Sequence, residues 1–172
     1  MFDIITPHHK KKAVAVTNVD KVAVENAKIS LALDSGKYDI KRGGKNKEEV
    51  LMVAHSDVSY TPQRVLIFRA KISNFVFNSK ILINPIIVEK SGEQVVIQSD
   101  LTKPEKSQKK IKRYKDITVE FLNTRGVQRR GRCSGIVAGL IQQGIERLDG
   151  ISILDPNYEE NREVPTSVEV NP

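Results

Sequence analysis

Cysteine, tryptophan and long apolar runs are scarce in this sequence, and each shortage excludes a class of protein. The chain has 172 residues with one cysteine, no tryptophan and 5% aromatic residues. The lone Cys133 excludes an internal disulfide framework and is typical of a reducing compartment. Few aromatic side chains argue against a stacking platform for single-stranded nucleic acid. Without a membrane-length apolar run or a secretory signal pattern, we expect a protein of the cytoplasm, or of a particle assembled there.

Positive charge is concentrated in one segment. The formal net charge is +7, and residues 101–132 carry most of the excess. We predict that this segment is a basic partner face that could contact a nucleic-acid backbone. Its residues are Lys106, Lys109, Lys110, Lys112, Arg125, Arg129, Arg130 and Arg132. A lysine-rich loop that only aids solubility is the open alternative.

The length predicts one domain with a real core. We expect a basic polar leader over 1–12, the domain over 13–155 and an acidic, extended tail over 156–172. Strand and helix patterns compete over 13–33 and again over 48–54.

Alternating apolar residues elsewhere predict several strands. They cover 64–71, 81–88, 95–98 and 117–122, and a short strand follows over 151–155. The E-K-S-G-E-Q segment at 89–94 predicts a hairpin between the second and third of these strands.

One strong helix is expected from Ser134 to Asp149, with Ser134 as its N-cap and Gly150 as its stop. Its apolar residues recur at helical spacing, and Gln143 and Arg147 lie four residues apart on another face. Strands with one such helix indicate an α+β fold in which antiparallel sheets pack around a central C-terminal helix.

The helix also carries a family resemblance. Its segment Q-Q-G-I-E-R-L-D-G-I resembles the last helix of peptide deformylases, Q-H-E-x-D-H-L-x-G. The I-N-P at 83–85, the Q-S-D-L-T at 98–102 and the K-R-Y-K-D-I-T-V at 112–119 are similar to further family motifs in the same order. The resemblance covers about residues 50–155 and implies a deformylase-like fold.

The resemblance also implies where the catalytic residues of the family would fall. The cysteine and the two histidines that bind Fe²⁺ or Zn²⁺ correspond to Asp100, Gln143 and Arg147. The glutamate that serves as general acid and base corresponds to Gly144. The glutamine of the oxyanion site corresponds, on a weaker match, to His55, and Arg113 matches a family arginine that pairs near position 98.

These replacements lead to an expectation of lost chemistry. A guanidinium is a permanent cation and an amide oxygen is a poor ligand, so we expect no metal, no cofactor and no deformylation. We further expect Asp100 and Arg147 to form an ion pair beside Gln143, as a structural bridge in place of the metal.

The functional prediction is therefore a catalytically inactive deformylase-like module. It would serve in a larger protein or ribonucleoprotein assembly, either ribosome-associated or viral. Two alternatives remain open. One is a divergent metal-dependent hydrolase for formyl-peptide-like substrates, with His55, Asp100 and Glu146 as ligands. The other is a basic RNA-binding α+β protein.

Overall fold

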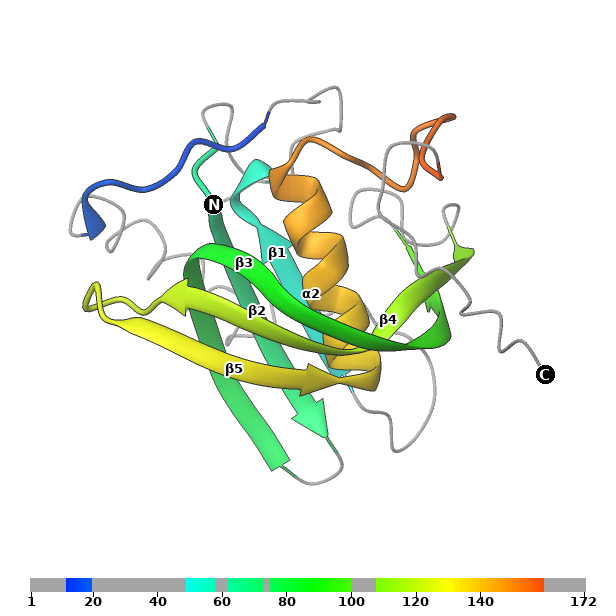
Figure 1. The fold of residues 1–172 in the computed structure, drawn as a ribbon, viewed down its shortest axis with the longest axis horizontal. Helices are drawn as coiled ribbons and strands as arrows, with labels where there is room; N and C mark the ends of the chain where they lie inside the picture. The colour runs from blue at the N-terminus through cyan, green and yellow to red at the C-terminus, as the bar shows by residue number, and fades with distance from the viewer. Residues whose placement is uncertain (1–11, 20–48, 58–61, 73–74, 100–107, 160–172) are drawn as a thin grey trace.

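The computed structural model describes residues 12–19, 49–57, 62–72, 75–99 and 108–159 (Figure 1). The leader up to residue 11, most of the ambiguous segment 13–33, and residues Asp100 and Lys106 lie outside these ranges. Among the described residues, no helix is both long and apolar enough to cross a membrane.

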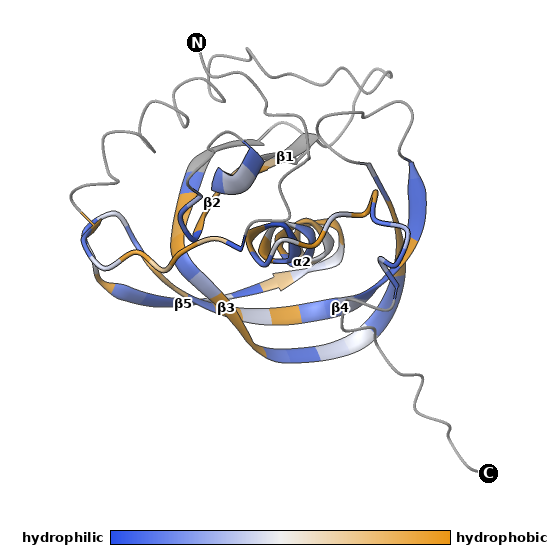
Figure 2. Cartoon of the chain, turned by 90° about the horizontal axis from the view of Figure 1, so that it is seen from above, coloured by the Kyte–Doolittle hydropathy of each residue, from blue (hydrophilic) through white to orange (hydrophobic). Residues whose placement is uncertain are grey.

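One five-stranded antiparallel sheet forms the body of the molecule, with the strands in sequence order. They are β1 (Glu49–Ala54), β2 (Val65–Ile72), β3 (Phe75–Gln98), β4 (Lys109–Leu122) and β5 (Gln128–Ser134), and a short 3-10 helix, η1 (His55–Asp57), follows β1. The sheet curls around helix α2 (Gly135–Leu148), which lies in its hollow (Figure 2). The α+β prediction is confirmed, although one curled sheet takes the place of several.

The long strand β3 differs from the sequence prediction. Its register with β4 runs on through Lys90, Ser91 and Glu93, so the predicted hairpin at 89–94 is wrong. Gly92 has a φ of +63°, which glycine adopts without a Cβ clash, and it lets the strand bend where a turn was expected. Two register shifts between Ile83 and Glu89 add further curvature.

Three other segments differ from prediction or settle an open choice. Residues 49–54 are a strand, and the basic run that was expected only to lead into the helix forms β5. The predicted strand at 151–155 is wrong, since a turn closes there through the Asp155 N–H and the Ser152 carbonyl.

Helix α2 packs its apolar side against the hollow of the sheet. Ala138, Ile141, Ile145 and Leu148 are buried in one cluster with core residues of β1, β2, β3 and β4. Ser134 takes the N-cap conformation, but its hydroxyl donates to Asp116 Oδ1 at 2.7 Å. At the other end, Gly150 has a φ of +81° and its N–H donates to the Arg147 carbonyl, which is the glycine stop that was predicted.

The chain after α2 returns to the sheet. Ile153 and Tyr158 are buried with Ile111 of β4 in a separate small cluster, so packed structure extends to Tyr158, inside the segment predicted as a tail. Lys109 Nζ donates to the Ile153 carbonyl at 2.6 Å and holds this return in place.

Candidate functional site

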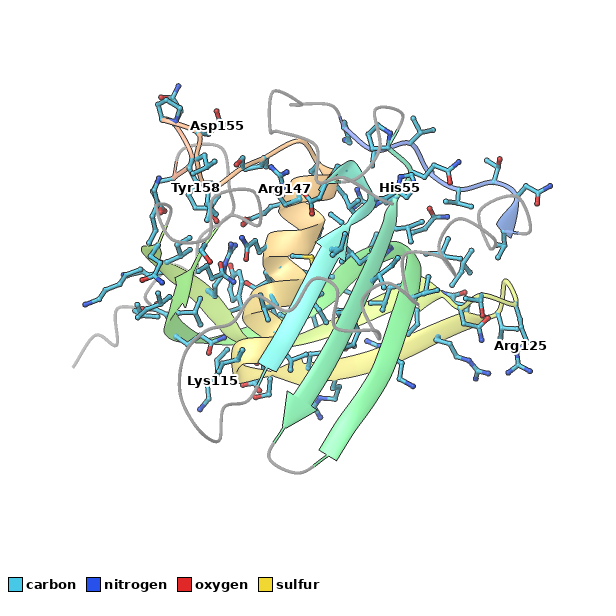
Figure 3. All side chains as sticks on the ribbon, turned by 180° about the vertical axis from the view of Figure 1, so that it is seen from behind. His55, Lys115, Arg125, Arg147, Asp155 and Tyr158 are labelled. Atoms are coloured by element: carbon cyan, nitrogen blue, oxygen red, sulfur yellow. The ribbon has the colours of Figure 1, made fainter. Side chains whose placement is uncertain are left out.

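Helix α2 buries polar side chains as well as apolar ones. Gln142, Gln143 and Arg147 are each less than a tenth exposed. Burial of a polar group is costly unless it is hydrogen-bonded, so the partners of these side chains define the site. Figure 3 shows Arg147 and His55 at the same end of the molecule.

Arg147 forms a buried ion pair with Asp57 of η1. Arg147 Nε and Nη2 donate to Asp57 Oδ1 at 2.9 and 2.5 Å. The second carboxylate oxygen accepts the Ala54 N–H at 2.9 Å, and Ser56 Oγ donates to the Arg147 carbonyl at 3.1 Å. Within the described ranges, the carboxylate partner of Arg147 is Asp57, which the sequence did not predict. The part played by Asp100, outside the described ranges, stays a prediction.

Asp57 is the functional residue that the sequence prediction missed. It follows the predicted His55 by two residues, but a lone carboxylate carries no signal of the distant arginine that it will meet, 90 positions along the chain.

His55 is buried beside this pair. Its Nδ1 accepts the Gln63 N–H at 3.1 Å, which requires that nitrogen to be unprotonated. The imidazole is therefore neutral, with its proton on Nε2.

Gln143 joins α2 to the end of β3. Its Nε2 donates to the Ser99 carbonyl at 3.0 Å, and Gln98 Nε2 donates in the opposite direction to the Gly139 carbonyl at 2.8 Å. These two hydrogen bonds from side-chain amides hold the last residues of β3 against the middle of the helix.

A second buried network surrounds Arg113 of β4. Its guanidinium donates to Gln98 Oε1 at 3.0 and 2.8 Å, to both carboxylate oxygens of Glu146, and to Tyr158 Oη at 2.7 Å. Tyr158 Oη donates in turn to Glu146 Oε2 at 2.8 Å. The family resemblance implied that Arg113 would pair with the residue at or near position 98, and the structure shows its contact with Gln98. The roles of Glu146 and Tyr158 were not predicted.

Gly144 lies where α2 passes close to β1 and β2. A Cβ placed on it would lie 2.7 Å from Met52 Sδ and 2.8 Å from Leu66 Cδ2, closer than real Cβ atoms come. At the position that corresponds to the general acid and base of the family, core side chains fill the space that a side chain would need.

The site residues that the structure describes do not fit a transition metal. No three His, Cys, Asp or Glu side chains in the described ranges are grouped to hold an ion. Of the alternative ligand set, Glu146 is engaged by Arg113 and Tyr158, and His55 lies with Asp57 and Arg147. Gln143 and Arg147 offer an amide and a cation, which bind Fe²⁺ or Zn²⁺ poorly or not at all.

The predicted basic partner face is described except for Lys106. Lys109, Lys110 and Lys112 lie on β4, Arg125 in the following turn, and Arg129, Arg130 and Arg132 on β5, all exposed. Acidic neighbours offset part of this charge. Arg130 pairs with Glu89 and lies 3.9 Å from Glu120, and Lys112 Nζ lies 3.8 Å from Glu93. Contact with nucleic acid stays a prediction.

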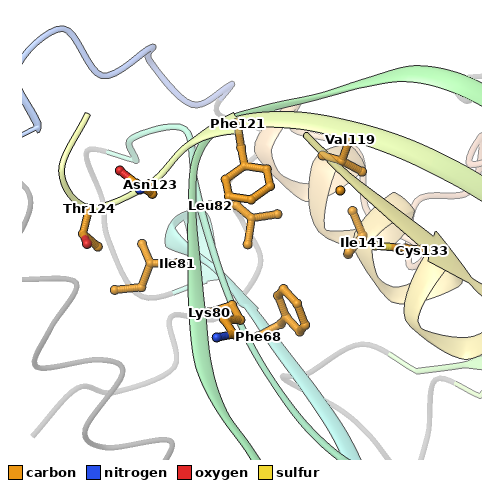
Figure 4. A pocket seen from close by; sticks show the side chains of 11 residues that line it. Phe68, Lys80, Ile81, Leu82, Val119, Phe121, Asn123, Thr124, Cys133 and Ile141 are labelled. Atoms are coloured by element: carbon orange, nitrogen blue, oxygen red, sulfur yellow. The ribbon is translucent and has the colours of Figure 1, made fainter. Parts of the chain in front are cut away.

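An apolar pocket of about 440 Å³ is lined by residues of β2, β3, β4, β5 and α2 (Figure 4). Its lining includes Phe68, Leu82, Phe121, Cys133 and Ile141. Burial raises the pKa of the half-buried Cys133 thiol, which lowers its thiolate fraction and therefore its reactivity.

Comparison with known proteins identifies the family. The model of the polypeptide deformylase family matches residues 46–163. The chain belongs to this family. A peptide deformylase of Dictyoglomus thermophilum is 34% identical over 83 residues, which cover 48% of this chain and 54% of that protein. Peptide deformylase 2 of Clostridium acetobutylicum is 40% identical over 74 residues, which cover 43% of this chain and 49% of that protein. The chain thus spans about half the length of these curated relatives.

The fold is also that of solved deformylases. A peptide deformylase of Synechococcus elongatus in complex with actinonin matches with a TM-score of 0.67 and 18% identity, covering 87% of this chain and 77% of that one. The deformylase-like fold expected from the sequence is confirmed.

These matches overturn the functional prediction. The family model and the relatives are deformylases, which are enzymes, so the expectations of a non-enzyme and of an inactive structural module in a ribosome-associated or viral assembly are wrong. The loss of the family's ligand residues does not by itself exclude a reaction. A fold can carry its chemistry on other groups, and function has to be argued from the site.

Proposed function

We propose that this chain is a divergent deformylase-family hydrolase that acts on N-formyl-peptide-like substrates in the cytoplasm. Membership of the family over residues 46–163 supports an enzyme of this class. The reaction would add water to the formyl carbon and break its bond to the peptide nitrogen, which releases formate and a free amine.

The observation that carries the proposal is the edge of β3. Strand β2 pairs with β3 only as far as Ile83, whereas β4 pairs with it from Ile83 to Gln98. Beyond Ile83, no strand that the structure describes pairs with the second edge of β3. An extended peptide can add to such an edge through its main chain, so this geometry suits a peptide substrate.

The polar end of α2 lies where this edge ends. Gln143 is bonded to Ser99, one residue past β3, and Arg147 is one helical turn further along α2. A peptide paired with β3 would therefore bring one of its ends to the part of α2 that carries these two side chains. The Synechococcus elongatus structure is a complex with actinonin, so a protein of this fold binds a ligand. The proposal includes binding of a formyl-peptide-like ligand by this chain.

Residue-resolved NMR titration tests the binding half of this function. We expect an N-formylmethionyl peptide to shift the amide signals of residues 86–99. The amide signals of β1, an outer strand of the sheet, should stay unchanged. Shifts confined to β1 or β5 would contradict a substrate on β3. The same peptide without its formyl group is the control for recognition of the formyl end.

A further inference from the structure

The ion pair of Arg147 and Asp57 stands where the family resemblance puts part of a metal centre. Arg147 corresponds to one histidine ligand of the family and Gln143 to the other. We propose that the Asp57–Arg147 pair, and not a metal ion, supplies the central charge of this site, so that the chain folds and is stable without a metal.

The charges support this assignment. Arg147 carries a permanent positive charge at the position of a ligand, and a divalent cation beside it would be repelled in a low-dielectric interior. Both partners are nearly completely buried, with side-chain exposures of 8% and 3%. Asp57 uses one oxygen for the guanidinium and the other for the Ala54 N–H, so both of its oxygens are engaged. A buried pair is stable only with such geometry.

The packing at Gly144 supports it independently. Met52 and Leu66 fill the space where a glutamate side chain would begin. Met52 belongs to β1, and Asp57 follows it in η1. One continuous segment, 52–57, therefore supplies both the residue that closes the space at Gly144 and the carboxylate that balances Arg147. Gly144 and Arg147, two positions of α2 that depart from the family motif, therefore both contact this one segment.

Metal content is the first test. The full chain would be produced in medium supplemented with iron, zinc, nickel and cobalt salts, purified anaerobically, and examined by elemental analysis. We expect far less than one metal ion per chain and a melting temperature that a chelator leaves unchanged. A content near one metal ion per chain, together with a melting temperature that falls on chelation, would overturn the assignment.

A double-mutant cycle is the second test, with variants Asp57→Asn, Arg147→Met and the combination of the two. We expect each single variant to lower the melting temperature, because each leaves a buried group without its partner, and the double variant to regain part of the loss. Asp149→Asn is the matched control. Asp149 also pairs with an arginine, Arg64, at 2.6 Å, but its side chain is 34% exposed, and its loss should lower the melting temperature less.

Two outcomes of the cycle would contradict the pair. One is an Asp57→Asn variant as stable as the parent. The other is a double variant whose melting temperature is no higher than that of the less stable single variant. A double variant and a single variant that both fail to fold would count as this outcome. Metal content and formate release are measured separately, so a metal-free chain that releases no formate would count against the proposed function alone.

Discussion

Helix α2 passes β1 so closely that a Cβ added to Gly144 would lie 2.7 Å from the sulfur of Met52. Met52 and Leu66 are both buried, so neither can move into solvent to relieve the contact. The glycine is therefore required by packing against the sheet, and the helix lies at this distance because no side chain intervenes.

Replacement of Gly144 by alanine should destabilise the protein by about 1–3 kcal/mol, the usual cost of overpacking a core. Urea unfolding of parent and variant measures the change. Gly139→Ala is the matched control on the same helix, because its Cβ would meet Val96 only at 3.4 Å. Higher helix propensity should make that control neutral or stabilising, by up to about 1 kcal/mol. Equal losses at both positions would contradict the close approach at Gly144.

Substitutions of two of the residues that bind Arg113 should lower the free energy of unfolding by different amounts. Glu146→Gln leaves a buried guanidinium without a carboxylate and should cost about 3–5 kcal/mol. Tyr158→Phe removes one hydroxyl and should cost about 1 kcal/mol. Urea unfolding gives both values, and a larger loss for Tyr158→Phe would show that the hydroxyl, and not the carboxylate, is the main partner of Arg113.

Glu89 should titrate below its ordinary range. The hydrogen bond from Thr118 Oγ1 to its carboxylate, followed by the attraction of Arg130, lowers the pKa of Glu89. A carboxyl group whose pKa is lower in the folded state stabilises the protein above its unfolded pKa, and that contribution is lost as the pH falls through the folded value. NMR titration should place this pKa below that of an unfolded glutamate.

Variants of the two partners separate the causes of this shift. Thr118→Val and Arg130→Met should each raise the pKa of Glu89, because the first removes the largest single cause of the shift and the second removes the attraction and hydrogen bond of Arg130. Added salt should weaken the effect of Arg130 and spare that of Thr118, since salt screens exposed charges. A pKa of Glu89 unchanged by Thr118→Val would contradict this arrangement.

Helix α2 could be predicted from the sequence because its signals are local. Apolar spacing, the capping position of Ser134 and the glycine at 150 all lie within one segment, and the structure places the helix at Gly135–Leu148. Strand β3 shows the opposite case. Gly92 in E-K-S-G-E-Q fits a hairpin turn as well as a bend within a strand, and only the pairing of residues 89–98 with β4 decides between them.

The polar partners could be predicted only where a family motif carried them. The resemblance gave the position of Arg113 near Gln98, and the contact is present. The pairing of Asp57 with Arg147 joins segments 90 residues apart and appears in no local pattern. The functional prediction failed for a related reason, because the residues at a few ligand positions do not decide the activity of the whole fold.

Formate release tests the proposed enzyme most directly. The purified full chain would be incubated with an N-formylmethionyl peptide, in parallel with and without a chelator, and formate would be measured over time. The proposed function predicts formate in at least one condition, at a rate that rises with protein concentration and exceeds that of heat-denatured chain. A folded chain that releases no formate in either condition would contradict it.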